Sequence, residues 1–389
     1  MYQVIIHTAP SIVFGMDTVD TTGEEAKKLS LKRILLVSGP NVQKAGIVER
    51  VEKSLKSQNI EVMVKIEGRS TPEPEPKAAE EAAESAREMK ADGIIGLGGG
   101  SVLDVAKMSS VLLTNPLKVR DYFGREKVPN RGIPTIMIPT TSGTGAEVTK
   151  HAIFLDEQAN VKKAVASSAL LPNVAIIDPM LTFSCPPSVT ASAGIDAWLH
   201  AVEPYISNRT NPITDNLAIN AITLITKSLA RAYYRGDDLD ARYDMSLGSL
   251  MAGMVLNNAG TSLVHALAYP IGGEFHISHG LSLTPLLLSC FEYIIAAKQE
   301  RFKAIALAMG ENVNGLSDRN AARVCLEAIR DMLLQLDLPI CLNDVGLTDK
   351  SKADKWAIGA IAEQRLLSRA PRILSVEDIK KIYLNAFSR

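Results

Sequence analysis

Two side chains in the second half of the chain have the types and spacing of a metal-binding pair. Asp196 and His200 lie four residues apart in an apolar stretch, so on a helix both side chains lie on the same face. Because the neighbouring residues are Ile, Ala, Trp and Leu, an unpaired carboxylate would be costly to bury there. A bound cation would remove that cost.

Two histidines further along the chain can complete such a site. His265 lies in an apolar stretch that we expect to be a helix ending at Pro270 and the following glycines, and His279 comes after a short loop. One carboxylate and three imidazoles suit Fe²⁺ or Zn²⁺ and leave a coordination position open for a substrate oxygen. Taken alone, each histidine could equally be a hydrogen-bonded core or loop residue. The predicted ligands are Asp196, His200, His265 and His279.

A glycine-rich turn in the first half has the form of a phosphate-binding site. An expected strand at residues 93–97 leads into the turn, and an expected helix follows from Val102. Glycines allow a ligand to approach the backbone closely, and a helix N-terminus offers unpaired N–H groups to a pyrophosphate. The spacing is not Gly-x-Gly-x-x-Gly, so a tight turn needed for packing is the alternative. The turn consists of Gly98, Gly99, Gly100 and Ser101.

A second polar loop follows the next expected strand, at residues 134–139. Its hydroxyl groups can bind phosphate or carboxamide groups from the carboxyl end of that strand, although a solvated Ser/Thr loop has the same composition. Because both loops would lie at the same edge of one sheet, together they predict a dinucleotide site. The contacts expected from this loop are Thr140, Thr141, Ser142 and Thr144.

The elements that must position these residues differ between the two halves of the chain. Expected strands at 33–38, 61–66, 93–97, 134–139 and 174–177 alternate with expected helices, among them 48–58 and 77–90. This alternation predicts a parallel sheet with helices on both faces. After Pro186 the pattern is almost wholly helical, over residues 188–205, 211–234, 243–269, 281–310, 320–336 and 350–367.

We therefore predict an α/β dinucleotide-binding domain at residues 1–185 and an all-helical metal-binding domain at residues 186–389. The length of 389 residues fits two domains. The net charge of −1, without a basic stripe, argues against nucleic acid as a partner. We found no signal-peptide pattern and no uninterrupted apolar stretch of membrane-spanning length, and the four scattered cysteines fit reduced thiols. A cytoplasmic enzyme is expected.

The motifs resemble those of the iron-dependent alcohol dehydrogenases, in the dehydroquinate synthase-like superfamily, over essentially the whole chain. Residues 98–107, which include Asp104 and Lys107, look like the family's pyrophosphate motif, and residues 139–149 look like its nicotinamide-side loop. The four predicted metal ligands fall on the family's ligand positions. The resemblance implies hydride transfer between NAD or NADP and a small alcohol or carbonyl compound, with the metal as Lewis acid. It also implies a homodimer or larger homo-oligomer.

The chain departs from the family at two positions. Many members have a second histidine four residues after the third ligand, where this chain has Tyr269; the proton could instead pass through Tyr269, His276 or His151. NAD-specific members often carry Asp after the first strand, where this chain has Gly39, so NADP is not excluded. Lys162 resembles a ribose-contacting position, although a solvated surface lysine is the alternative.

Three other functions fit parts of the pattern. Tyr269 keeps a hydroxyacid–oxoacid transhydrogenase open. A lyase like dehydroquinate synthase also pairs NAD with a metal, but its phosphorylated substrate requires several Lys or Arg residues, whereas the metal motifs here are flanked by Leu, Val, Ala and Ile. A non-enzymatic nucleotide sensor would not need an intact metal set. We expect a small, weakly charged substrate.

Overall fold

The computed structural model describes residues 3–68, 73–156, 161–275 and 277–388. The chain forms two compact units, one of residues His7–Cys185 and the other of Pro186–Arg389 together with the N-terminal residues up to Ile6. Each unit has hydrophobic core clusters of its own: two in the first unit and one large cluster in the second.

The first unit is built on a six-stranded sheet whose paired strands all run parallel. Its inner strands β2, β4, β6 and β9 are almost entirely buried, as expected where helices cover both faces. In spatial order the strands are β1 (Ser11–Phe14), β9 (Val174–Ile177), β6 (Thr135–Pro139), β4 (Gly93–Gly98), β2 (Arg33–Ser38) and β3 (Glu61–Ile66).

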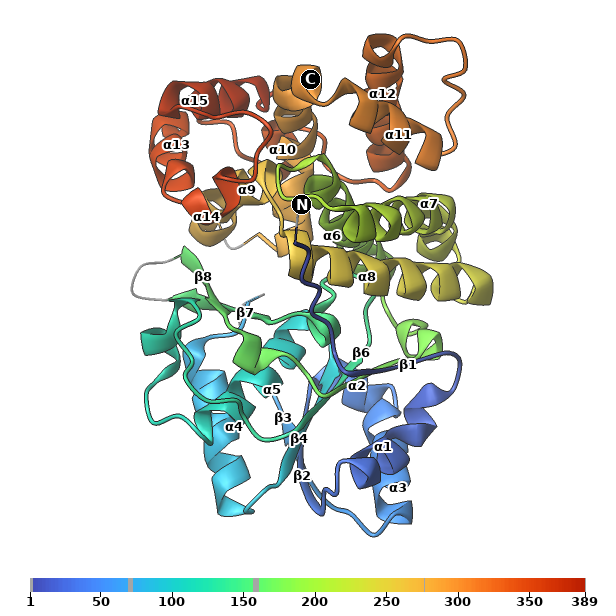
Figure 1. The fold of residues 1–389 in the computed structure, drawn as a ribbon, viewed down its shortest axis with the longest axis vertical. Helices are drawn as coiled ribbons and strands as arrows, with labels where there is room; N and C mark the ends of the chain where they lie inside the picture. Colours follow the sequence, from blue (N-terminus) through green and yellow to red (C-terminus); the bar gives the residue numbers. More distant parts are fainter. Residues whose placement is uncertain (1–2, 69–72, 157–160, 276, 389) are drawn as a thin grey trace. The chain divides into compact units, whose positions relative to one another are not determined.

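Helices pack on both faces of this sheet, and β2 shows why. Its side chains alternate: Leu35 and Val37 belong to one core cluster, with α4 (Pro76–Glu88) and α5 (Gly100–Leu112), while Ile34 and Leu36 belong to the other, with α1 (Thr22–Lys28) and α3 (Ile47–Ser57). Figure 1 shows α4 and α5 on one side of the strands and α1 and α3 on the other. The predicted doubly covered parallel sheet is confirmed.

The strand order places a ligand-binding edge between β2 and β4. From β2 the chain continues outward to β3, returns to β4 on the other side of β2, and then builds β6 and β9 in that direction. Open α/β sheets bind ligands at the carboxyl ends of the strands where the direction of winding reverses. The residues at this point are Gly39, just after β2, and the glycine turn, just after β4.

Several elements of the first unit were not predicted. A second sheet contains the antiparallel pair β7 (His151–Asp156) and β8 (Val161–Ala166), with the two-residue β5 (Gly124–Arg125) beside β8. The edge strand β1 was also missed, because four half-buried residues have too little periodicity to mark a strand. The short helix α2 covers Pro40–Lys44, and 3-10 turns cover Thr18–Thr21, Val119–Tyr122, Ala146–Val148, Ser168–Leu170 and Pro179–Thr182.

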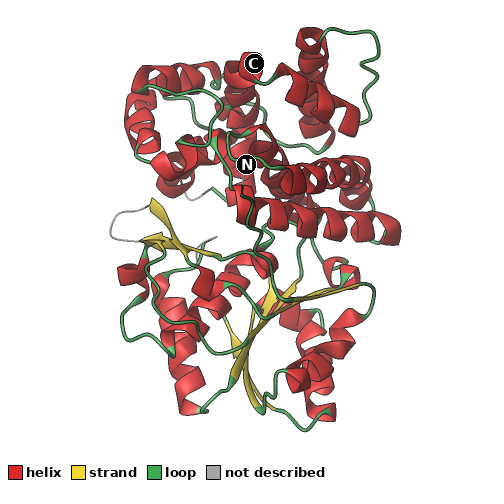
Figure 2. Cartoon of the chain, viewed as in Figure 1, coloured by secondary structure: helices red, strands yellow, loops and turns green. Residues whose placement is uncertain are grey.

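The described residues of the second unit form helices joined by loops, without a β-strand, as Figure 2 shows. Three 3-10 turns, Ile295–Ala297, Leu342–Val345 and Lys350–Lys352, lie between its helices. The α-helices are α6 (Pro187–Ile206), α7 (Pro212–Tyr234), α8 (Leu239–Ala259), α9 (Leu263–Phe275), α10 (His279–Ile294), α11 (Gln299–Ala308), α12 (Asp318–Gln335), α13 (Ala353–Ile361), α14 (Gln364–Leu367) and α15 (Val376–Asn385).

Several helix boundaries differ from the prediction. The stretches 281–310 and 350–367 are each divided, the first into α10 and α11 and the second into α13 and α14, and α15 was not predicted. The stretch 243–269 is split at Gly260, whose φ of +75° lies in the left-handed region that favours glycine, so α8 and α9 are separate helices. The end expected at Pro270 is wrong, because α9 continues through this proline to Phe275. A proline inside a helix costs about 3 kcal/mol. Packing offsets that cost: Ile271 and the two glycines after it are buried, and α13 lies against α9.

One segment, His279–Ala297, is long and apolar enough to cross a membrane by length and composition, with a mean hydropathy of 1.5. In the structure 67% of that window is buried inside the protein. Its leucines and Phe291 belong to the main core cluster of the helical unit. The segment therefore has the packing of a core helix.

Candidate metal centre and nucleotide loops

The four predicted ligand residues converge within the helical unit. Around the Oδ1 atom of Asp196 lie the Nε2 atoms of His200 at 3.3 Å, His265 at 3.5 Å and His279 at 3.6 Å. One candidate ligand atom from each residue lies within 4.8 Å of all the others. Helix α6 contributes Asp196 and His200, as the four-residue spacing predicted, while α9 contributes His265 and α10 begins at His279.

This spacing fits a divalent ion. In a tetrahedral site with bonds of about 2.1 Å, neighbouring ligand atoms lie roughly 3.4 Å apart. The distances of 3.3–3.6 Å from Asp196 Oδ1 to the three nitrogens match that edge length. Oδ1 of Asp196 and Nε2 of His265 are buried without a hydrogen-bond partner, although groups of this kind are almost always satisfied in proteins. A cation at the centre would satisfy both atoms.

The surroundings of the set are buried and strongly polar. Burial alone would raise the pKa of Asp196, but the attraction of His200 and His279 outweighs it and holds the pKa below its usual value. Burial alone would lower the pKa of His265, but Glu203 and Asp196 outweigh it and raise this pKa to about 9. Negative charge that attracts a proton this strongly also attracts a metal cation.

One side of the set is more open than the rest. The side chains of Asp196, His200 and His265 are 3–6% exposed, whereas that of His279 is 28% exposed. His279 is therefore the most accessible of the four residues.

Gly280 has no Cβ atom, and this allows the start of α10, which carries His279, to lie close to α6. A Cβ atom at this position would lie 2.3 Å from the backbone oxygen of Ser192, in α6. We expect Gly280→Ala to push the start of α10 away from α6, lowering stability by about 1–3 kcal/mol and weakening metal binding. Thermal unfolding and metal content after loading would measure both effects. Gly68→Ala is the control, because nothing lies within 4 Å of the added atom there; an unchanged melting temperature and metal content in Gly280→Ala would contradict the expectation.

The two predicted nucleotide loops contact each other in the α/β unit. Gly98 pairs with Pro139 at the ends of β4 and β6, and the amide of Thr140 donates to the Gly98 carbonyl at 3.0 Å. A Cβ atom on Gly100 would lie 2.4 Å from the Thr144 hydroxyl oxygen. The loops thus lie side by side at one sheet edge, as the order of strands and loops predicted.

The glycines also bring α5 close to the sheet and leave its N-terminus open. A Cβ atom on Gly96 would lie 2.8 Å from the Ala106 Cβ, so α5 packs unusually close to β4. The N-cap residue of α5 is Gly99, which has no side chain to cap the first-turn N–H groups. This helix start has the features that favour an anion.

Two charged residues of the predicted cofactor motif hold the loops in place. Lys107 is fully buried; its amino group forms an ion pair with Asp104 at 2.9 Å and donates to the carbonyls of Ala146 and His151. The second oxygen of Asp104 accepts the amide of Ile153 at 2.9 Å. These bonds join α5 to the end of the Thr/Ser loop and to β7. A direct contact of Asp104 with the cofactor stays a prediction.

Lys162 is not a solvated lysine. It lies on β8 with a side chain 3% exposed, and its amino group pairs with Glu73 at 2.7 Å. The alternative of a surface lysine is therefore wrong, whereas contact with a ribose stays a prediction.

The three candidates for moving the proton lie in different places. Tyr269 is one helical turn after His265, and its ring centroid lies 6.4 Å from that of His279. His151 is the first residue of β7, in the α/β unit. His276 lies outside the described residues.

Sequence reasoning did not identify Glu203, whose carboxylate accepts a hydrogen bond from Nδ1 of His265 at 2.5 Å. Its position three residues after His200 was an available signal.

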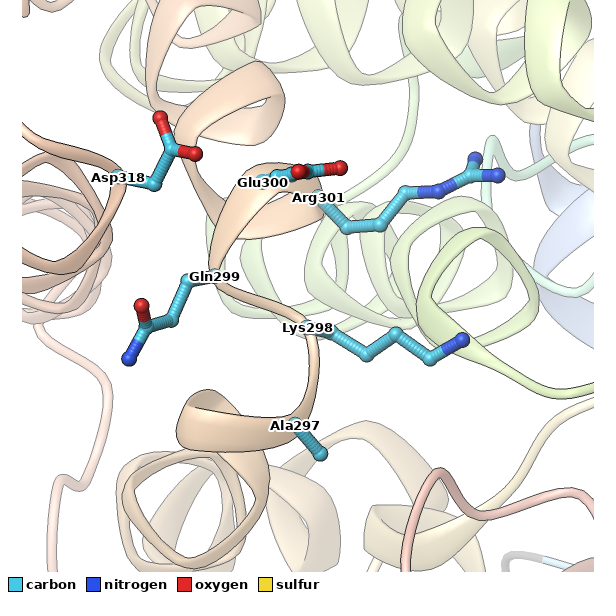
Figure 3. Close-up of a pocket in the computed structure, with 6 residues that line it drawn as sticks. All are labelled: Ala297, Lys298, Gln299, Glu300, Arg301 and Asp318. Carbon is cyan, nitrogen blue, oxygen red and sulfur yellow. The ribbon is translucent and has the colours of Figure 1, made fainter.

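A pocket of about 360 Å³ elsewhere in the helical unit has different properties. Its lining is polar, and Figure 3 shows Gln299 and Asp318 on the opposite side of the backbone from Lys298 and Arg301. Arg301 is already paired with Asp215 at 2.6 Å. The pocket contains none of the predicted site residues.

Comparison with known proteins matches both halves of the chain to one family. A family model described as iron-containing alcohol dehydrogenase matches residues 9–179, and one for the C-terminal part of the same family matches residues 190–387. The chain belongs to the iron-containing alcohol dehydrogenase family. It is thus an oxidoreductase acting on CH–OH groups, a metal-dependent, NAD-linked alcohol dehydrogenase or aldehyde reductase.

Relatives of this alcohol dehydrogenase match over nearly its whole length. Long-chain-alcohol dehydrogenase 1 of Geobacillus thermodenitrificans is 41% identical over 377 residues, covering 96% of this chain and 94% of the relative. The crystal structure of a 1,3-propanediol oxidoreductase superposes with a TM-score of 0.95 at 33% identity, covering 99% and 100% of the two chains. A sulfoacetaldehyde reductase from Bifidobacterium kashiwanohense, solved in complex with NAD⁺, superposes with a TM-score of 0.88 at 26% identity, covering 100% of both chains.

Proposed function

We propose that Asp196, His200, His265 and His279 hold a divalent metal, iron by family and zinc as an alternative, and that the enzyme interconverts a small, weakly charged alcohol and its carbonyl form. The observation that carries the proposal is the convergence of three imidazole Nε2 atoms on one buried carboxylate oxygen. A nicotinamide cofactor bound at the glycine turn would exchange a hydride with the substrate, whose oxygen the metal would bind.

Each part of the chain has a separate task in this proposal. When bound, the metal supplies a Lewis acid for the carbonyl or alkoxide oxygen of the substrate. The open start of α5 binds the pyrophosphate, and the hydroxyls of Thr140, Thr141, Ser142 and Thr144 fix the phosphates and the nicotinamide carboxamide. The partly exposed edge at His279 admits the substrate oxygen. Tyr269, beside His279, holds or passes the proton at its hydroxyl group.

A weakly charged substrate is supported by the sequence of α9, the helix that carries His265, which contains no Lys or Arg. The relatives support an alcohol or aldehyde but differ in what their names specify, from long-chain alcohols to 1,3-propanediol and sulfoacetaldehyde. We therefore propose uncharged primary alcohols and aldehydes as substrates, with hydroxy acids and sulfonated aldehydes as the competing classes.

A substrate panel tests the function directly. Aliphatic aldehydes of increasing length, 3-hydroxypropanal, glyoxylate and sulfoacetaldehyde would each be assayed with NADH and NADPH, before and after loading with Fe²⁺ or Zn²⁺. We expect cofactor oxidation with the uncharged aldehydes that is lost on chelation and restored by metal. Full activity after chelation and dialysis would refute the metal role. Exchange between a hydroxy acid and an oxo acid without net cofactor oxidation would indicate the transhydrogenase.

Gly39 tests the choice between NAD and NADP. It has an extended backbone, and a Cβ atom there would lie 3.8 Å from Val102, so a side chain fits. We expect Gly39→Asp to lower kcat/KM for NADPH about tenfold or more, because its carboxylate would repel the 2′-phosphate, with little change for NADH. Gly39→Asn, of the same size without the charge, is the control. Equal effects of the two substitutions on NADPH would show that charge at this position does not select the cofactor.

We further propose a cytoplasmic homo-oligomer, most simply a homodimer. The family resemblance supports the oligomer, and scattered cysteines, three of them buried, suit a reducing compartment. Size-exclusion chromatography with light scattering would measure the oligomeric state.

A further inference from the structure

Glu203 is a buried carboxylate beside the candidate metal set that receives three N–H donors. It lies on α6 three residues after His200 and seven after Asp196, so all three share one helix face. Its side chain is 1% exposed. One oxygen accepts the backbone amide of Val264 at 2.6 Å; the other accepts the amide of Ser262 at 3.1 Å and Nδ1 of His265 at 2.5 Å.

These contacts determine which nitrogen of His265 can bind a metal. An ionised carboxylate can only accept hydrogen bonds. Nδ1 of His265, which contacts the Glu203 carboxylate, therefore carries the hydrogen. In the neutral imidazole Nε2 then presents its lone pair, and this atom lies 3.5 Å from Asp196 Oδ1, within the metal set. Ser262 and Val264 flank the start of α9, so the same carboxylate also anchors the helix that carries His265.

Charge balance gives Glu203 a second effect. Asp196 and Glu203 together carry two negative charges, while metal-binding imidazoles are neutral. With a divalent ion the buried group would be electrically neutral, which avoids the large cost of burying net charge. Without Glu203 the same group would carry a net positive charge.

We propose that Glu203 is a positioning residue for the metal: it orients His265, sets its tautomer and balances the charge of a divalent ion. This inference rests on the proposed metal role of the four ligand residues. Carboxylates that bind the second nitrogen of a metal-bound histidine typically contribute 10- to 100-fold to metal affinity.

Glutamine cannot replace Glu203, although it has the same size. A glutamine side chain ends in one acceptor oxygen and one donor nitrogen. Each of the two carboxylate oxygens of Glu203 faces at least one N–H group, so one of these groups would face the glutamine nitrogen. With the NH₂ group toward Val264, two donors would face each other. With the NH₂ group toward His265, the imidazole would have to accept at Nδ1 and carry its hydrogen on Nε2, the atom needed for the metal.

The test compares Glu203→Gln with Glu274→Gln, a matched control on α9, the helix that carries His265; the Glu274 carboxylate pairs with Lys352 and Lys355. The dissociation constant for Zn²⁺ would be measured by chelator competition on the full-length, metal-free protein, and Co²⁺ absorption would report ligand geometry. We expect Glu203→Gln to weaken Zn²⁺ binding 10- to 100-fold and to alter the Co²⁺ spectrum, while nucleotide affinity stays unchanged. Glu274→Gln should match the wild type in all three measurements.

The outcomes separate this inference from the proposed function. An unchanged Zn²⁺ affinity and Co²⁺ spectrum in Glu203→Gln would overturn the role of Glu203 alone. If that variant does not fold, Glu203→Asp, which keeps the charge but is one methylene shorter, decides: intermediate Zn²⁺ affinity supports the role, and wild-type affinity overturns it. Failure of the wild-type protein to bind Zn²⁺ would refute the metal site itself, and this inference with it.

Discussion

Replacement of Asp196 by alanine is expected to abolish metal binding and turnover while leaving nucleotide affinity intact. Asp196 supplies the oxygen on which three imidazole nitrogens converge, and it is 3% exposed. Loss of a Lewis acid that stabilises the transition state by several kcal/mol would lower kcat by roughly a thousandfold or more. Metal content by mass spectrometry, steady-state kinetics and nucleotide titration would measure the three quantities.

Two further variants give this prediction its controls. Asp196→Asn keeps the shape but loses the charge, so we expect it to bind metal much more weakly than the wild type. Asp244→Asn removes a carboxylate on α8 that pairs with Lys227 and Ser228, and it should leave metal content unchanged. A retained metal content together with normal turnover in Asp196→Ala would mean that the four residues do not form the reaction centre.

Gly100→Ala should produce the second large effect, on nucleotide binding. The added Cβ atom would lie 2.4 Å from Oγ1 and 2.5 Å from Cγ2 of Thr144, so the glycine turn and the Thr/Ser loop would have to separate. We expect the dissociation constant for NAD(H) or NADP(H) to rise about tenfold or more, a change of about 1.4 kcal/mol, and the melting temperature to fall. Isothermal titration calorimetry and thermal unfolding would check both.

Gly99→Ala distinguishes a clash within the protein from a clash with the ligand. A Cβ atom there meets nothing closer than Thr141 at 3.7 Å, so the melting temperature should stay unchanged. If the pyrophosphate lies against this backbone, nucleotide binding should still weaken. Combining Gly100→Ala with Thr144→Ala removes the two nearest atoms and should recover part of the lost stability. No effect of Gly100→Ala on either measurement would contradict the proposed contact between loops and cofactor.

What could be predicted from the sequence depended on short-range periodicity. The four-residue spacing of Asp196 and His200 places both on one face of any helix, and the buried strand before Gly98 identifies a turn at a sheet edge whichever strands lie beside it. The run of alternating strands and helices likewise indicated the parallel sheet. These features depend on the geometry of a few consecutive residues, so they can be recognised without knowledge of the rest of the fold.

The remaining features depend on contacts between residues far apart in the chain. His265 comes 65 positions after His200, and only the packing of α10 against both α6 and α9 brings the imidazoles to one carboxylate. The ion pair of Lys162 with Glu73 and the continuation of α9 through Pro270 also arise from tertiary packing, which outweighs local preference. The spacing of Glu203 from His200 places it on the ligand face of a helix, but the sequence does not show what its carboxylate contacts. Its three N–H donors come from residues 59 to 62 positions away, so the fold alone decides that this charge is buried beside the metal ligands.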